Sequence, residues 1–212
     1  MKSTLKISAV CATLAVVIAG VYVSSVVWRV SAAEQKLFGR SYLLPLKRRA
    51  PEYNEYPTRE SHDDGTYSFV RAGKFVKVHK QMILGFQHTY SSALTAYEVG
   101  DMAADALLRA NEYAETYLSA HGDSLRHYMN SRRDLYNNRV GRAIGADARN
   151  RGLSGQRAEL YIVRQILQAM DNGIVLSHYR DEKVRLLPTP EQYGCPGLPK
   201  PTELAGLNSH AI

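Results

Sequence analysis

An uncharged N-terminal stretch constrains this chain more than any other feature. Residues 7–28 are 22 consecutive positions without Asp, Glu, Lys or Arg. A helix of that length rises about 33 Å, which is enough to cross the hydrocarbon core of a bilayer. Lys2 and Lys6 precede the stretch, and Trp28 and Arg29 end it, as is typical of a membrane-spanning helix. The sequence therefore predicts the membrane as a partner of residues 7–28.

Two interpretations of this stretch stay open, an uncleaved anchor and a cleaved signal peptide. Residues 30–32, Val-Ser-Ala, resemble a site for signal peptidase. The hydrophobic region of a signal peptide is usually about 7–15 residues long, and this stretch is longer, so an anchor is favoured. The lysines before the stretch favour a cytoplasmic N-terminus, whereas several cations after it favour the opposite orientation. We expect the C-terminal part outside the cytoplasm.

The charge of the chain argues against nucleic-acid binding. The net charge is +7, and three of the cations (Lys2, Lys6 and Arg29) flank the apolar stretch, which leaves about +4 for the rest. That remainder is spread along the chain, whereas nucleic-acid binding needs a concentrated basic surface. We expect no nucleic-acid partner, and an envelope polymer or a protein stays open as a partner. The two cysteines, Cys11 and Cys195, are not expected to pair.

The sequence predicts a mainly α-helical protein in four parts. They are a membrane anchor or signal segment at 1–33, a spacer at 34–79, an α-helical domain at 80–190 and an irregular tail at 191–212. Within the proline-containing spacer, residues 69–70 and 75–78 are expected as short extended pieces.

Apolar residues recur at helical spacing in four segments of the helical domain. The expected helices are 81–98, 101–121, 132–148 and 154–173, with a linker at 122–130 and a minor β-hairpin from 174–179 and 183–187. The first helix has no charged residue from Gln81 to Tyr97. A solvated face normally carries charges, so this helix is expected at the centre of the domain.

The second and third helices contain unusual positions. The buried stripe expected for the second helix is Ala103, Leu107, Ala114 and Leu118. This stripe includes Asn111 and leaves Glu112 outside it. On the third helix, Asp134, Asn138, Gly141 and Gly145 share one face. Glycine within a helix costs about 1 kcal/mol relative to alanine, so the two glycines indicate close backbone approach by another element.

Three ionisable residues among the apolar periodicity form the predicted catalytic group. His88 is suited to act as a general base or a metal ligand. Glu112 and Asp134 are suited to orient His88 or to act as ligands. The competing interpretation is structural: a histidine bonded between helices, a surface glutamate and an aspartate at a helix N-terminus. Polar groups among apolar residues raise the free energy unless they are paired or used, so a site is expected here.

Three further residues are predicted to bind substrate. Asn137 and Asn138 offer amides for polar groups of a substrate, and Arg142 offers a cation for an anionic group. Their structural alternatives are also open. The asparagines would tie helices together and satisfy buried backbone groups, and Arg142 would pair with a carboxylate such as Asp134.

The order FQHTYSSALT at 86–95, GD at 100–101, ANE at 110–112 and DLYNNRVGR at 134–142 carries a resemblance. It resembles an uncharacterised bacterial helical domain family with the pattern FRHAYW…AHE…DLYNNxVGR, over about residues 80–190. The resemblance implies a helical fold and one site. The family's polar positions fall on His88, Glu112, Asp134, Asn137, Asn138 and Arg142.

Two departures from that pattern bear on metal binding. Gln87 stands where the family has arginine, and Asn111 stands where it has the histidine of AHE. His121 lies nearly three helical turns from Asn111 and is a poor substitute for that histidine. We therefore expect no cofactor and no tightly bound metal. A hard cation such as Mg²⁺ would need several oxygens converging near Glu112.

No sequence motif identifies a reaction, because the chain has no GxSxG, HExxH, Walker or GxGxxG pattern and no zinc-type Cys/His spacing. We expect a helical protein of the bacterial inner membrane with its domain in the periplasm or outside, secreted if the N-terminal segment is cleaved. One interpretation of its site is a hydrolase acting on an envelope substrate. The alternative is a non-enzymatic envelope protein, a component or accessory of a secretion, conjugation or phage system.

Overall fold

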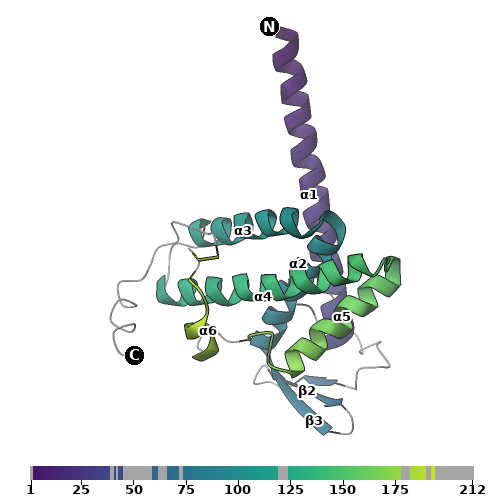
Figure 1. The fold of residues 1–212 in the computed structure, drawn as a ribbon, viewed down its shortest axis with the longest axis vertical. Coiled ribbons are helices and arrows are strands. Elements are labelled where there is room, and N and C mark those ends of the chain that lie inside the picture. The colour runs from purple at the N-terminus through teal and green to yellow at the C-terminus, as the bar shows by residue number, and fades with distance from the viewer. Residues whose placement is uncertain are drawn as a thin grey trace.

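Helices make up most of the fold in the computed structural model (Figure 1). The structure describes residues 2–38, 41, 43–44, 59–61, 66–71, 74–118, 124–177, 182–189 and 192–193. The helices are α1 (Lys2–Phe38), α2 (Lys80–Val99), α3 (Asp101–Leu118), α4 (Ser124–Asn150), α5 (Gly155–Asp171) and α6 (Glu182–Leu186). The predicted mainly α fold, with an N-terminal apolar helix and a helical domain, is confirmed. His121 and most of the predicted tail lie outside the described residues.

The uncharged helix α2 is the centre of the domain, as the sequence predicted. It packs against α1, α3, α4 and α5. Ile83, Phe86, Tyr90 and Leu94 on its apolar side are at most 2% exposed. Phe86 stacks on Tyr90 and meets Phe38 of α1 edge-on. Because α2 has neighbours on several sides, its uncharged polar face also lies against protein.

Two glycines allow α4 to lie unusually close to α2. A Cβ atom on Gly141 would overlap the carbonyl oxygen of Thr89, and one on Gly145 would overlap that of Ala93. This confirms the close approach that the glycine spacing predicted. Asn138 and Asp134 lie about one and two helical turns before Gly141 on the same face of α4.

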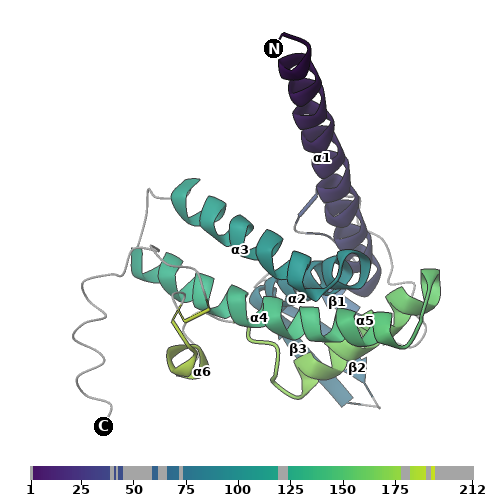
Figure 2. The same cartoon turned by 45° about the horizontal axis from the view of Figure 1, so that its top comes forward.

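The apolar helix α1 has two different halves. Val17, Ile18 and Val21 are exposed, whereas Val30 and Leu37 are buried in the domain core. Figures 1 and 2 show the N-terminal half projecting alone from the domain. In the described part of the chain, the stretch Val17–Phe38 has the length and composition of a candidate membrane anchor or signal sequence.

The buried face of α3 differs from the expected stripe. Leu107 is 52% exposed and Asn111 is exposed, whereas Ala104 and Glu112 are buried. The prediction followed the apolar residues, but α3 turns its polar side towards the domain, where Glu112 meets polar groups of α2 and α4. The side chain of Leu118 lies outside the described part.

The expected linker at 122–130 is wrong for residues 124–130, which belong to α4. Tyr128 and Met129 are buried in a small apolar cluster with Leu176 and Val184. Helix stability in proteins comes mainly from tertiary packing, and here the packing partners lie about fifty residues away in the sequence.

The expected β-hairpin after Gly173 is also wrong. Residues 182–186 form the short helix α6, and residues 174–177 are irregular. The sequence Glu-Lys-Val-Arg-Leu consists mostly of good helix formers, and its single valine, Val184, is fully buried. Residues 178–179 of the expected first strand lie outside the described residues.

A small antiparallel sheet lies in the region that the sequence predicted as a spacer. Its strands are β1 (Arg59–Ser61), β2 (Thr66–Arg71) and β3 (Lys74–His79), in the order β1-β2-β3. Phe69 pairs with Arg59 on one side and Val76 on the other. The expected extended pieces at 69–70 and 75–78 therefore lie in β2 and β3. The four domain boundaries stay a prediction.

The glycine contact makes a stability prediction. We expect Gly145→Ala to lower the free energy of unfolding by about 1–3 kcal/mol, because its methyl group would force α4 away from α2. The measurement is denaturant unfolding of the full chain in detergent micelles. Gly20→Ala in α1 is the control, since nothing lies within 4 Å of a Cβ there. Equal stability of the wild type and Gly145→Ala would contradict the close contact.

Candidate functional site

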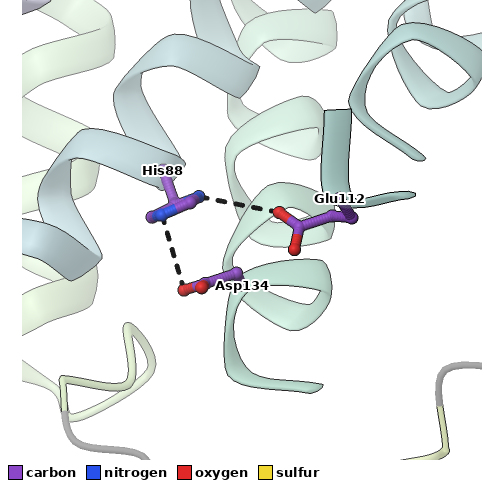
Figure 3. Close-up of side chains that lie close together, drawn as sticks. All are labelled: His88, Glu112 and Asp134. Atoms are coloured by element: carbon purple, nitrogen blue, oxygen red, sulfur yellow. Dashed lines mark ion pairs between the residues drawn. The ribbon is translucent and has the colours of Figure 1, made fainter. Parts of the chain in front are cut away.

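The three residues predicted as catalytic converge in the domain (Figure 3). His88 comes from α2, Glu112 from α3 and Asp134 from α4, and one ligand-type atom of each lies within 4.8 Å of the others. His88 Nδ1 is 3.9 Å from Glu112 Oε1, and His88 Nε2 is 3.6 Å from Asp134 Oδ1. These separations are too long for hydrogen bonds. The imidazole therefore lies between two carboxylates without being hydrogen-bonded to either one.

The three side chains differ in their access to solvent. The His88 side chain is 22% exposed, whereas those of Glu112 and Asp134 are 2% and 7% exposed. The imidazole is thus the part of the cluster that a molecule from solvent can reach first. The carboxylates lie behind it in the packed interior.

Arg133 supplies the positive charge that holds Asp134. Its Nε donates to Asp134 Oδ1 at 2.8 Å, and its Nη2 donates to Oδ2 at 3.0 Å. Such a two-bond pair fixes the carboxylate plane as well as its charge. Arg133 Nη1 also donates to the carbonyl oxygen of Ser177 at 3.3 Å, which links α4 to the segment after α5.

A chain of polar side chains reaches Glu112 from α2. Ser92 Oγ donates to Asn138 Oδ1 at 2.7 Å, and Asn138 Nδ2 donates to Glu112 Oε1 at 3.3 Å. Burial raises the pKa of Glu112 well above its usual 4.5, and the nearby Asp134 carboxylate raises it further. The Asn138 amide and the Arg133 guanidinium act in the opposite direction. Glu112 therefore keeps its proton to a higher pH than an exposed glutamate does.

Asn137 has a structural position in this fold. Its side chain donates to the carbonyl oxygen of Leu176 at 2.8 Å and accepts from the Leu176 N–H at 3.0 Å. It is fully buried, and both ends of its amide are used. This geometry matches the structural alternative for Asn137, since the amide satisfies backbone groups of an irregular buried segment.

Arg142 lies away from Asp134 and pairs with two other carboxylates. Its guanidinium is 3.3 Å from Asp101 and forms a close ion pair with Asp105, both on α3. Arg142 therefore joins α4 to the start of α3. Arg142 thus pairs with carboxylates, as its structural alternative expects, but with Asp101 and Asp105 in place of Asp134.

A cavity of about 210 Å³ lies beside the cluster. Asn138 and Arg142 line it, together with Asp105, Leu108, Arg109, Leu135, Arg139, Gln192 and Tyr193. Asn138 links the cavity to the His88–Glu112–Asp134 cluster, because it lines the cavity and also hydrogen-bonds Glu112. Three arginines and one aspartate give the lining a positive balance.

The cluster satisfies one condition that the sequence analysis set for a hard cation. Carboxylate oxygens of Glu112 and Asp134 approach each other beside an imidazole nitrogen. Three protein ligands with remaining positions for water are enough for a weakly held divalent ion, whereas a structural zinc site has four. The expectation that the chain holds no tightly bound metal stays a prediction.

Two residues of the site were missed by the sequence analysis. Arg133 precedes Asp134 directly and would have been visible as an adjacent opposite charge. Ser92 lies one helical turn after His88 on the uncharged polar face of α2. The sequence pattern predicted that face but not a role for Ser92. Their role depends on which helix packs opposite, and local spacing does not contain that information.

In the described residues, the fold and site define a helical protein with an N-terminal apolar helix and a cluster of the half-buried His88 with the buried Glu112 and Asp134. No family model, no curated protein and no solved structure matches the chain. The resemblance to the FRHAYW…AHE…DLYNNxVGR family therefore stays a prediction.

The raised pKa of Glu112 predicts how stability depends on pH. Because the folded chain holds this proton more tightly than the unfolded chain, the free energy of unfolding should fall as pH rises from about 4.5 through the folded pKa. We expect Glu112→Gln to flatten that fall, measured by denaturant unfolding in a chelator-containing buffer. Glu115→Gln, which removes a smaller contributor to the raised pKa of Glu112 on the same helix, should keep most of that fall. An identical pH slope for the wild type and Glu112→Gln would contradict the assignment.

Proposed function

We propose that this chain is a membrane-anchored hydrolase that acts on a substrate of the bacterial envelope, with His88, Glu112 and Asp134 as its catalytic groups. The observation that carries the proposal is the convergence of a solvent-reaching imidazole and two buried carboxylates from three different helices. Burying ionisable groups in a helical core is costly, and apolar side chains would pack there at lower cost. A catalytic use accounts for their retention.

The environments of the three groups suggest separate roles. His88 is the group that a substrate meets, and its imidazole offers a nitrogen lone pair that can accept a proton, so it serves as the general base. Asp134, held by Arg133, orients the imidazole and stabilises its protonated form. Glu112 is suited to be the general acid, because its raised pKa keeps it protonated to higher pH. Catalytic contacts of this kind often tighten only when substrate binds.

The adjacent cavity supports the expected substrate-binding role of Asn138 and Arg142. Both line it beside Arg109 and Arg139, so an anionic group of a substrate would meet several positive charges there. Asn138 would connect that group to Glu112. Asn137 is proposed only as a support, because Leu176 occupies both ends of its amide.

The proposal predicts that a substitution of His88 lowers hydrolytic activity but not the stability of the fold. We expect full-length protein in detergent to hydrolyse at least one class in a panel of carboxyl esters, phosphate esters, amides and isolated envelope polymer. His88→Ala should lower that rate by about 10²–10⁴-fold, the usual contribution of a general base. Its thermal unfolding should be nearly unchanged. His127→Ala on α4 is the matched control and should keep activity. No hydrolysis by the wild type across the panel would contradict the proposal.

A non-enzymatic envelope protein is the second candidate, and one observation favours it. Asn137 bonds the backbone of Leu176 through both ends of its amide, and Arg133 donates to the Ser177 carbonyl as well as to Asp134, so polar groups near the cluster hold elements together. Such a protein would be a component or accessory of a secretion, conjugation or phage system. His88→Ala would then lower the free energy of unfolding by roughly 1–3 kcal/mol, as expected for a broken buried polar network.

The proposed location has its own test. We expect residues 7–28 to anchor the chain in the inner membrane with residues 34–212 outside the cytoplasm, because two lysines precede an uncharged stretch. A C-terminal fusion to alkaline phosphatase should be active, and a fusion to a fluorescent protein that matures only in the cytoplasm should stay dark. The reverse pair of results would contradict the export of the domain.

A further inference from the structure

Helix α3 shows its apolar side to solvent. Most of the exposed positions among the described side chains are apolar, namely Met102, Ala103, Ala106, Leu107, Ala110 and Ala114, and the polar ones are Asp101, Asn111 and Glu115. Met102 is 86% exposed and Leu107 is 52% exposed. A surface helix of a soluble domain normally has the opposite arrangement, with its apolar stripe towards the core. An apolar stripe of this length marks an interaction surface.

The inward side of the same helix is polar. Asp105 pairs with Arg142 of α4, and Glu112 meets His88 and Asn138. Turning the apolar residues inward would therefore remove the polar cluster and the ion pairs to α4. The apolar residues of α3 therefore face outward, where an apolar environment outside the domain would stabilise them.

The position of α3 relative to α1 identifies that environment. Figures 1 and 2 show α3 on the side of the domain from which the N-terminal half of α1 projects, with α4 on the other side of α3. Arg29 of α1 pairs with Glu98 at the end of α2, just before Gly100 turns the chain into α3. The start of α3 is thus held beside the last residues of the predicted membrane stretch.

We propose that the outward face of α3 lies on the bilayer surface that α1 enters, with Met102 and Leu107 in the boundary between headgroups and acyl chains. The inference rests on the membrane anchoring proposed above. Helix α3 crosses the direction of α1 in both views, so it runs along the surface while α1 passes through it. A helix with an apolar face and a polar opposite face is suited to such an interfacial position.

Exposed apolar residues on both α1 and α3 support a lipid partner. Val21, Val23 and Trp28 of α1 are 66%, 58% and 58% exposed, close to the level at which Arg29 meets Glu98. Trp28 is a residue type that favours the membrane interface. Glu112 lies on the opposite side of α3, so the His88 site would be held about one helix diameter, roughly 10 Å, from the membrane.

Spin-label accessibility tests the proposal on the full chain. Single-cysteine variants Leu107→Cys, Val17→Cys and Gln168→Cys are made with Cys11→Ala and Cys195→Ser, labelled, and reconstituted in phosphatidylethanolamine–phosphatidylglycerol vesicles. Power saturation compares collisions with oxygen, which concentrates in lipid, and with a water-soluble nickel chelate. Gln168 is an exposed residue of α5 and is the matched control for a water-facing helix position. We expect positions 107 and 17 to favour oxygen and position 168 to favour the chelate.

The other outcomes separate this inference from the anchoring. Position 17 in lipid with position 107 in water would overturn the α3 proposal and leave the anchor intact. Position 17 in water would refute the anchoring, and the α3 proposal would fall with it. Position 107 shielded from both reagents, with broadening from a neighbouring label, would show that a second copy covers the face and would overturn the lipid assignment. Met102→Cys repeats the reading if Leu107→Cys does not fold.

Discussion

The contact between the backbones of α2 and α4 is the constraint on which the site depends. Gly141 and Gly145 lie against the carbonyl oxygens of Thr89 and Ala93, where any side chain would clash. This approach brings α4 near enough for Asn138 to accept a hydrogen bond from Ser92. Glycine within a helix lowers helix stability, so packing has to offset that loss. The polar face of α2 and the polar face of α4 are joined as a result.

Helix α3 completes the site by an unusual orientation. It contributes Glu112 to the cluster and Asp105 to the ion pair with Arg142, and both residues lie on its inward side. The two buried carboxylates are close to each other, and Arg133 together with Asn138 makes that proximity tolerable. The same orientation leaves the apolar residues of α3 on the outer surface of the domain. The position of Glu112 in the site and the exposure of these residues therefore have the same cause.

Much of the fold could be predicted from the sequence because it depends on local patterns. The absence of charge from Gln81 to Tyr97 marked α2 as central, and the glycine spacing marked the close contact of α4. The orientation of α3 could not be predicted from its apolar stripe, because the pairings of Asp105 and Glu112 with α4 turn its polar side inward and local spacing does not show them. The early start of α4 and the helix at Glu182–Leu186 depend on distant contacts, among them the burial of Val184. Of the site, His88, Glu112 and Asp134 were selected as chemically suitable residues, but their convergence is a property of three helices that no single motif contains.

A double-mutant cycle between His88 and Asp134 tests the convergence most directly. The free energy of unfolding is measured for the wild type, His88→Ala, Asp134→Asn and the double variant. The geometry predicts a coupling energy of about 0.5–3 kcal/mol, as for residues in contact. Such coupling is compatible with a small effect of His88→Ala alone, because the lost attraction to Asp134 is offset when the imidazole no longer has to be desolvated. The control cycle pairs His88→Ala with His127→Ala and should be additive within about 0.5 kcal/mol. Additive effects of His88→Ala and Asp134→Asn would contradict the account, because residues that do not meet in the folded chain do not couple.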